Sequence, residues 1–234
     1  MTRILAIETS TELASAAVLA DGQIFTRELS GVQTHSQGIL PAIQSLLAEA
    51  GIALADCDAI AFGCGPGAFT GIRTACGIVQ GLAYGAGLPV LPVVSLQVMA
   101  QAALEQVAEG EFVCILDARM NEVYWAQYRF AENHWVTVSA PALASLEEVF
   151  ASLSGTMMLR ELRVVLGNGL TLPEALLGQV AGIHCMPHAK QVAELGKITF
   201  DAGNSQPAEF AQPLYLRNKI ALTTAERALV KASG

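Results

Sequence analysis

Short apolar runs separated by turn residues characterise the first part of the chain, and they predict strands followed by a helix. Asp21-Gly22, between two such runs, is a dipeptide typical of a β-hairpin turn. After Gly31 the apolar positions recur every three or four residues up to Ala50, and Gly51 follows where a helix would end. The predicted elements are strands at residues 4–7, 14–19 and 23–29 and a helix at residues 36–50.

The same order of patterns returns further along the chain. Residues 59–62 form another apolar run that ends in a glycine-rich turn. A helix at 70–85, a strand at 90–94 and a helix at 95–108 are predicted after it. A second series then begins, with strands at 112–116, 123–130 and 135–138, a short helix at 145–153 and a strand at 164–166.

Each series runs strand, acidic residue, hairpin, helix, strand and Gly-x-Gly. Glu8 and Gly63 are 55 residues apart, and Asp117 and Gly167 are 50 apart. The repeat predicts an α/β fold with two similar mixed-sheet domains that face each other across a cleft. We expect the first domain at residues 1–108, with residues 212–234 returning to it, and a reduced second domain at 109–211. The alternative is that two α/β stretches share a pattern by chance.

Composition bears on the compartment. The chain is 53% apolar and 15% charged, and no charge occurs in the 31 residues between Arg73 and Glu105. Glycine and proline interrupt that stretch, so it predicts a helix, a turn and a strand rather than a membrane span. The N-terminal residues show no export signal, and the five cysteines are odd in number and never paired as C-x-x-C. We therefore expect a cytoplasmic protein that binds no membrane.

Charge argues against unaided nucleic-acid binding, since the chain carries a formal net charge of −8. Residues 211–234 differ, with a local charge of +3. Such a segment either contacts RNA or an acidic partner or is simply solvated. We expect no direct tRNA binding by the chain alone.

The turn from Gly63 to Gly71 follows a strand and opens a helix, where backbone N–H groups can hold an anion. It lacks the Lys-Ser/Thr of a Walker loop, and the acid that a dinucleotide fingerprint requires about 20 residues later is missing. The turn is thus either a phosphate-contact loop or a structural or partner-contacting loop. The candidate phosphate contacts are Thr9, Ser10, Gly65 and Gly67.

The first hairpin resembles the phosphate-binding turn of actin-like ATPases, which typically reads Asp-x-Gly. Here the turn reads Glu8-Thr9-Ser10, and its counterpart is Asp117-Ala118-Arg119. Without the glycine a phosphate has less room near the backbone. Glu8 is either a catalytic carboxylate or a residue that orients the hairpin, and we predict no catalytic residue.

The histidines suggest no metal site. His184, Cys185 and His188 form a conceivable cluster, but Pro187 rules out a continuous helix presenting both histidines, and no other ligand lies nearby in the sequence. We predict that the chain holds no metal.

The predicted helix at 70–85 carries only a thin polar stripe, and glycines recur along it every four residues. Either the chain itself buries this helix or a second protein covers it, and we favour an interface. The predicted interface residues lie on this helix and on the helix at 36–50: Ile39, Ile43, Leu46, Ile72, Ala75, Cys76, Gly77, Val79, Gly81 and Leu82.

Five segments together resemble the TsaB (YeaZ) family, and the resemblance covers essentially the whole chain. The segments are Ile4 to Ser10, Thr34-His35-Ser36 before Leu40-Pro41, Gly65 to Arg73, Asp117 to Arg119 with Glu122-Val123-Tyr124, and Pro213 to Arg217. The resemblance implies the actin-like (sugar kinase, Hsp70, actin) fold. It also implies a non-catalytic accessory role in tRNA threonylcarbamoyladenosine synthesis.

The resemblance further implies partners. A larger paralogue, TsaD, carries the metal and transfers threonylcarbamoyl to the adenosine beside the tRNA anticodon, and a small ATPase, TsaE, joins the complex. The first two helices would contact TsaD, and homodimers would form through the same surface when TsaD is missing. The paralogue's metal motif is H-x-x-x-H, whereas this chain has His35 and Ile39. The resemblance implies no cofactor for this chain, and it leaves open whether a nucleotide binds at the boundary with TsaD. The rival hypothesis is an ATP-hydrolysing or phosphotransferring enzyme that uses the interdomain cleft.

Overall fold

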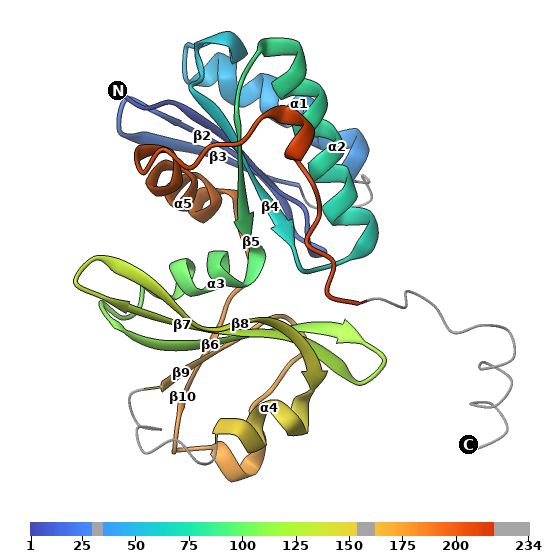
Figure 1. The fold of residues 1–234 in the computed structure, drawn as a ribbon, viewed down its shortest axis with the longest axis vertical. Coiled ribbons are helices and arrows are strands. Elements are labelled where there is room, and N and C mark those ends of the chain that lie inside the picture. Colours follow the sequence, from blue (N-terminus) through green and yellow to red (C-terminus); the bar gives the residue numbers. More distant parts are fainter. Residues whose placement is uncertain (30–34, 154–161, 218–234) are drawn as a thin grey trace, which may run out of the picture.

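The computed structural model describes residues 1–29, 35–153 and 162–217. Two five-stranded mixed sheets with their helices form two halves, one above the other in Figure 1, which confirms the predicted α/β fold of two similar parts. Thr34 and the charged residues beyond Arg217 lie outside the described residues.

The first sheet has the order β3-β2-β1-β4-β5, and β1 at its centre pairs antiparallel with β2 and parallel with β4. All of β1 is buried, because helices cover both faces of the sheet. Leu5 and Ile7 pack toward α1 and α2, and Ile4 and Ala6 pack toward α5. Burial on both faces explains the unbroken apolar run. The elements are β1 (Ile4–Glu8), β2 (Ala14–Ala20), β3 (Gln23–Leu29), β4 (Ala59–Gly65), β5 (Val90–Val94), α1 (His35–Glu49), α2 (Phe69–Ala86) and α5 (Ala189–Asp201), with a short 3-10 helix at Leu54–Asp56.

The second sheet has the order β10-β9-β6-β7-β8 and repeats the first sheet strand for strand. β6 pairs antiparallel with β7 and parallel with β9, as β1 does with β2 and β4. Residues 4–7 and 112–116, the first strands of the two predicted series, therefore occupy equivalent central positions in the two sheets. The elements are β6 (Gly110–Arg119), β7 (Glu122–Ala131), β8 (His134–Ser145), β9 (Leu162–Leu166), β10 (Ala181–His184), α3 (Ser95–Ala103) and α4 (Leu146–Leu153), with short 3-10 helices at Glu174–Leu176 and Ala208–Phe210.

Helix α3 lies between the two sheets (Figure 1). Its Leu96 and Met99 join the core that contains Phe112 and Cys114 of β6. Val98 of the same helix belongs to the core cluster of Ile4 and Ala6 in the first half. Helix α3 therefore packs against both halves and forms part of the junction between them.

The chain returns to the first half earlier than predicted. Helix α5 packs against β1 and β4, and its Val192 and Ala193 belong to the same core cluster as Ile4. Residues 189–211 thus belong to the first half, and the predicted return at residue 212 is wrong.

Close packing explains how α5 sits on the sheet. A Cβ at Gly196 would lie 2.6 Å from the Cβ of Ala61, so only glycine lets the helix approach this closely. Two side chains cap the start of α5: Ser15 Oγ of β2 accepts the N–H of Ala189 at 2.9 Å, and His188 Nδ1 accepts the N–H of Lys190 at 3.0 Å.

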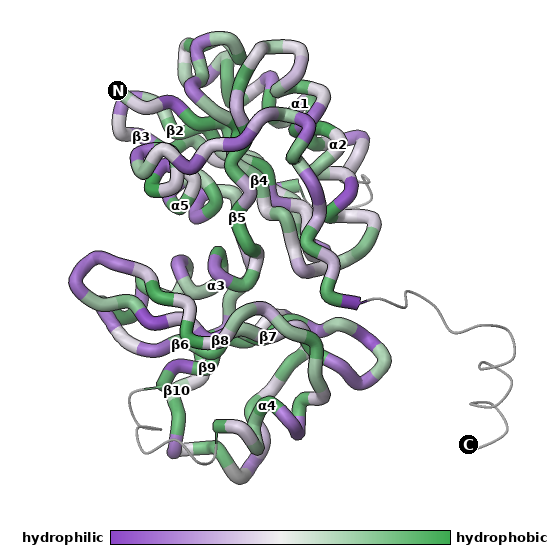
Figure 2. Tube along the Cα trace, viewed as in Figure 1, coloured by the Kyte–Doolittle hydropathy of each residue, from purple (hydrophilic) through white to green (hydrophobic). Residues whose placement is uncertain are grey.

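Strand β5, which leads from the first half to α3, consists mainly of hydrophobic residues, and α3 contains more of them (Figure 2). Within the described ranges, no helix is long and apolar enough to cross a membrane. The charge-free stretch after Arg73 is therefore helix α2, strand β5 and helix α3.

Candidate functional site in the cleft between the halves

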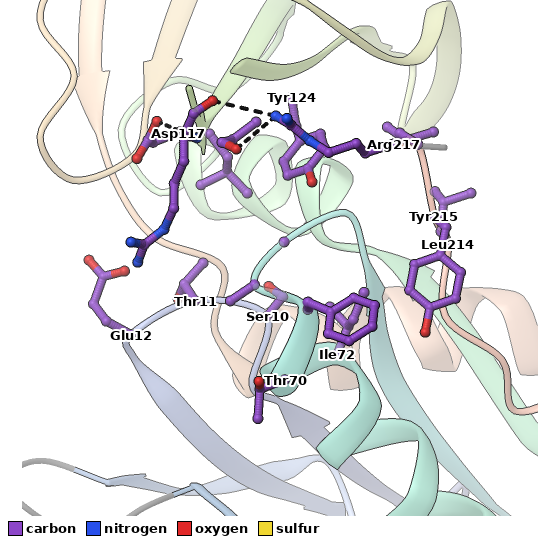
Figure 3. A pocket seen from close by; sticks show the side chains of 18 of the residues that line it. Ser10, Thr11, Glu12, Thr70, Ile72, Asp117, Tyr124, Leu214, Tyr215 and Arg217 are labelled. Atoms are coloured by element: carbon purple, nitrogen blue, oxygen red, sulfur yellow. Dashed lines mark hydrogen bonds between the residues drawn. The ribbon is translucent and has the colours of Figure 1, made fainter. Parts of the chain in front are cut away.

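A cleft of 780 Å³ opens between the two halves, and Figure 3 shows its walls. The first half contributes the β1–β2 turn and the start of α2, and the second contributes the β6–β7 turn. The C-terminal segment closes one side. The lining includes Ser10, Thr11, Glu12, Gly67 to Ile72, Leu116 to Met120, Tyr124, Asn168 and Leu214 to Arg217.

The carboxylate of Glu8 is buried beneath this cleft and does not line it. Its Oε1 accepts the N–H of Ser10 at 2.6 Å, and its Oε2 accepts a hydrogen bond from Ser95 Oγ at 3.2 Å. Burial raises the pKa of the Glu8 carboxyl, although its hydrogen bonds with Ser10 and Ser95 act in the opposite direction. Glu8 thus orients the hairpin turn, which is the second of the two roles considered for it.

The glycine-rich loop packs directly onto the first hairpin turn. Ala68 N–H donates to Ser10 O at 2.6 Å, and Thr9 Oγ1 donates to Gly71 O at 2.7 Å. A Cβ at Gly67 or Gly71 would overlap the backbone of Ser10 or Thr9. These two glycines are needed for the contact between the two turns.

The structure divides the four predicted phosphate contacts into two that line the cleft and two that do not. Thr9 is fully buried with its hydroxyl engaged, and neither Thr9 nor Gly65 lines the cleft. Gly65 has φ +103°, and a Cβ there would lie 3.3 Å from the carbonyl oxygen of Leu214, so its role is to let the C-terminal segment pass. Ser10 and Gly67 do line the cleft, but they pack against each other so closely that a Cβ at Gly67 would overlap the backbone of Ser10.

The second hairpin turn has the same internal geometry. Asp117 Oδ1 accepts the N–H of Arg119 at 2.9 Å, as Glu8 accepts that of Ser10. Unlike Glu8, Asp117 is exposed on the cleft wall. Arg217 reaches this turn from the C-terminal segment and donates to the carbonyl oxygen of Ala118 at 3.0 Å, as Figure 3 shows.

The part of the chain that the structure describes offers neither a reactive thiol nor a metal cluster at the site. Burial raises the pKa of Cys64 and Cys76 to about 12, so both thiols stay protonated and weakly nucleophilic at neutral pH. Among the described residues, no three His, Cys, Asp or Glu side chains gather closely enough to hold a metal ion. His188, part of the conceivable cluster, instead caps α5.

Most of the predicted interface residues are internal. The structure buries seven of them in the chain's own core, and Leu82 packs partly against it, so their prediction as a surface is wrong. The seven are Ile39, Ile43, Leu46, Ile72, Ala75, Cys76 and Val79. Helix α2 has an ordinary amphipathic pattern whose outer face, apart from the exposed Arg73, is built from glycine and uncharged residues.

Gly77 and Gly81 are the predicted interface residues that the structure exposes. A Cβ built at Gly77, Gly81 or Gly85 meets nothing within 4 Å. Tyr84 beside them is 83% exposed, and Leu40 on α1 is 43% exposed. The outer faces of α1 and α2 thus form a surface that is largely uncharged, which we call the α1–α2 face.

Two cross-cleft contacts were not anticipated from the sequence. Asn168 Nδ2 donates to Glu12 Oε1 at 2.7 Å, and Arg217 pairs with Glu122 at 2.7 Å. Each joins residues far apart in the chain. The sequence features that could have pointed to these contacts are Gly167-Asn168-Gly169 at a strand end and Arg217 after an apolar stretch.

Comparison with known proteins finds relatives that match this chain over nearly its whole length. A family model described as TsaD, tRNA N6-adenosine threonylcarbamoyltransferase, matches residues 23–219. The chain is 37% identical over 230 residues to the tRNA threonylcarbamoyladenosine biosynthesis protein TsaB of Escherichia coli (strain K12), covering 94% of this chain and 96% of that protein. It is 35% identical over 227 residues to TsaB of Haemophilus influenzae, covering 93% and 94%.

Solved structures show the same architecture. YeaZ from Pseudomonas aeruginosa superposes with a TM-score of 0.79 at 34% identity, over 92% of this chain and all 100% of that one. An uncharacterized P. aeruginosa protein, described as similar to the peptidase YeaZ, gives a TM-score of 0.82 at 35% identity, over 93% and 100%. These matches and the TsaD family model confirm the predicted actin-like fold.

Proposed function

Because this chain belongs to the TsaB (YeaZ) family, we propose that it serves tRNA threonylcarbamoyladenosine synthesis in the cytoplasm as a non-catalytic accessory subunit. It binds a larger actin-like paralogue of the TsaD type, which carries out the transfer to tRNA. A TsaE-type small ATPase joins the assembly, and the chain pairs with itself when the paralogue is missing.

The hydrogen bonding of the two hairpin turns is the observation that supports a non-catalytic role. In a phosphate-holding cleft these turns must be open to the ligand. Here the N–H of Ser10 donates to Glu8, the N–H of Arg119 donates to Asp117, and the N–H of Ala68 in the glycine-rich loop donates to Ser10 O, so these donors are already engaged. The buried Glu8 does not line the cleft, so it has no access to a substrate there. Backbone donors that a phosphate would need at both turns are thus bonded within the chain.

The α1–α2 face supports the proposal of a protein partner. Its exposed glycines let another helix approach the backbone of α2 closely. Tyr84 offers a large side chain with one polar atom, a type enriched at interface hot spots. An uncharged face of this kind loses little polar hydration when a partner covers it.

Reconstitution tests the proposal. The TsaD-type paralogue, the small ATPase and a tRNA substrate should form modified adenosine when this chain is present and form far less without it. Co-purification from the native cytosol, with mass identification of bound proteins, should return the paralogue. Full modification without this chain would contradict the accessory role.

The rival function is ATP hydrolysis or phosphoryl transfer in the cleft. The cleft volume of 780 Å³ and the exposed carboxylate of Asp117 on its wall favour it. Calorimetric titration with ATP and magnesium separates the two functions. We expect weak or no binding by the isolated chain. Tight saturable binding, with phosphate release abolished by Asp117→Asn, would establish the rival.

A further inference from the structure

Residues 213–217 leave the first half beside α2 and run down toward the second half (Figure 1). We call them the C-terminal strap. We propose that the strap is a latch that holds the two halves at a fixed opening, with Arg217 as its catch on the second half. Neither the TsaB relatives' names nor the proposed partner role assigns this function to the segment.

The upper end of the strap is anchored in the first half. Leu214 N–H donates to Cys64 O at 2.8 Å, and the Leu214 side chain packs against the core between the first sheet and its helices. The Tyr215 hydroxyl accepts a hydrogen bond from Arg73 Nε at 2.5 Å. The Arg73 guanidinium lies 3.6 Å from the ring centre of Phe69 and 5.5 Å from that of Tyr215. These contacts fix the point from which Arg217 extends.

The lower end is held by the β6–β7 hairpin of the second half. Arg217 Nη2 pairs with Glu122 Oε2 at 2.7 Å and donates to Ala118 O at 3.0 Å and Arg119 O at 3.4 Å. Its Nη1 lies 3.0 Å from Met120 Sδ. Only 15% of the Arg217 side chain is exposed, so water screens these contacts less than it would at the surface.

The hairpin is shaped to receive the guanidinium. Met120 and Asn121 have φ of 58° and 59°, which is the left-handed geometry of a two-residue hairpin turn. The carbonyl groups of Ala118 and Arg119 before this turn are the ones that accept from Arg217. A planar guanidinium serves two carbonyls and a carboxylate at once, which a lysine ammonium does not match.

The backbone connections explain why a latch matters. The described chain crosses between the halves twice, from β5 into α3 and from β10 into α5. The strap adds a third connection, which is non-covalent at its lower end. Release of Arg217 would remove its ion pair with Glu122 and its hydrogen bonds to the β6–β7 hairpin, while the bond between Asn168 and Glu12 across the cleft would stay. The halves could then rotate about the two crossings, as hinged domains do.

Distance measurements between spin labels test the latch. Labels at Tyr84→Cys (83% exposed, first half) and Leu177→Cys (61% exposed, second half) report the opening. The native thiols within the described residues react poorly: Cys57, Cys64, Cys76 and Cys114 are buried, and burial raises the pKa of the half-buried Cys185 to about 12. Dilution with an excess of unlabelled chain removes distances between molecules.

We expect Arg217→Ala to lengthen and broaden the Tyr84–Leu177 distance distribution, and Glu122→Gln to shift it the same way by less. Arg129→Ala is the matched control, since it removes an arginine–glutamate pair with Glu111 that lies wholly within the second half. It should leave the distribution unchanged. Circular dichroism checks folding of each variant.

An unchanged distribution in folded Arg217→Ala overturns the latch, and so does equal broadening in Arg129→Ala. If Arg217→Ala does not fold, Glu122→Gln decides, because Glu122 is 37% exposed and its replacement keeps the side-chain shape. Broadening in that variant supports the latch, and a distribution like the parent's refutes it.

Discussion

The carboxylate of Glu8 lies directly against the Cα of Gly63, so that a side-chain carbon at position 63 would overlap it. The first hairpin turn and the strand before the glycine-rich loop are locked together by this contact. Glu8 also accepts the N–H of Ser10, and Ser10 O accepts the N–H of Ala68. Glu8 is thereby linked to the glycine-rich loop on the cleft wall.

Gly63→Ala should destabilise the protein for this reason. The new methyl group must displace a fully buried carboxylate that is held by hydrogen bonds from Ser10 and Ser95. Overpacking of this kind costs about 1–3 kcal/mol. Urea unfolding of Gly63→Ala, Glu8→Ala and the double variant measures the coupling. We expect the double variant to lose less than the sum of the single losses, and strict additivity would show that the two residues do not oppose each other.

Glu8→Gln should stabilise the protein at neutral pH. Burial raises the pKa of Glu8 above its ordinary 4.5, so the native state holds the proton more tightly than the unfolded chain. The parent therefore has this stabilisation below pH 4.5 and loses it as the pH rises through the folded pKa, at a slope of about 1.4 kcal/mol per pH unit. Glutamine cannot ionise and keeps an acceptor for Ser10. Unfolding free energies should match near pH 4.5 and favour the variant at pH about 7; a constant difference would contradict this.

His188 should make the protein less stable in mild acid. Burial lowers its pKa below the ordinary 6.5, and Glu28, Lys190 and Glu105 are the charged groups that act on it. Its Nδ1 accepts the N–H of Lys190, and a proton on Nδ1 would break this helix cap.

The sign follows from the depressed pKa of His188. Above pH 6.5 neither state of the protein binds this proton, whereas below it the unfolded chain does so first and is favoured. His188→Asn keeps a capping side chain and cannot titrate. Between pH 7 and 5, the unfolding free energy of the parent should fall relative to that of the variant, by up to about 1.4 kcal/mol per pH unit. Parallel pH profiles would show that His188 does not titrate differently on unfolding.

Local patterns revealed the repeat of the two halves, and the reason is physical. Strands buried on both faces, such as β1, show as unbroken apolar runs, and hairpin turns have their own residue types. No helix was predicted at residues 189–201. The place of α5 on the first sheet depends on contacts with residues such as Ile4, far away in sequence. No local pattern indicates such a partner.

Most of the predicted interface residues proved to be internal for a related reason. Helix α2 showed only a thin polar stripe because glycines occupy much of its outer face, and its apolar residues fill the core, as Val79 does. The glycines of the 63–71 loop looked like a phosphate cradle, whereas Gly67 and Gly71 make room for the neighbouring turn. Backbone approach to a ligand and backbone approach to another loop require the same residue.

The most direct measurement of the central claim is the affinity of Gly81→Arg for the TsaD-type paralogue. Gly81 is exposed with open space around it, so arginine should leave the fold intact and even favour the helix by about 1 kcal/mol. Ala202→Arg, an exposed position at the end of α5, is the matched control for added charge. By calorimetry we predict a loss of about 2–4 kcal/mol in binding free energy for Gly81→Arg, on the scale of an interface hot spot, and parent affinity for the control. A folded Gly81→Arg that binds the paralogue as tightly as the parent would contradict the claim that the protein acts through the α1–α2 face.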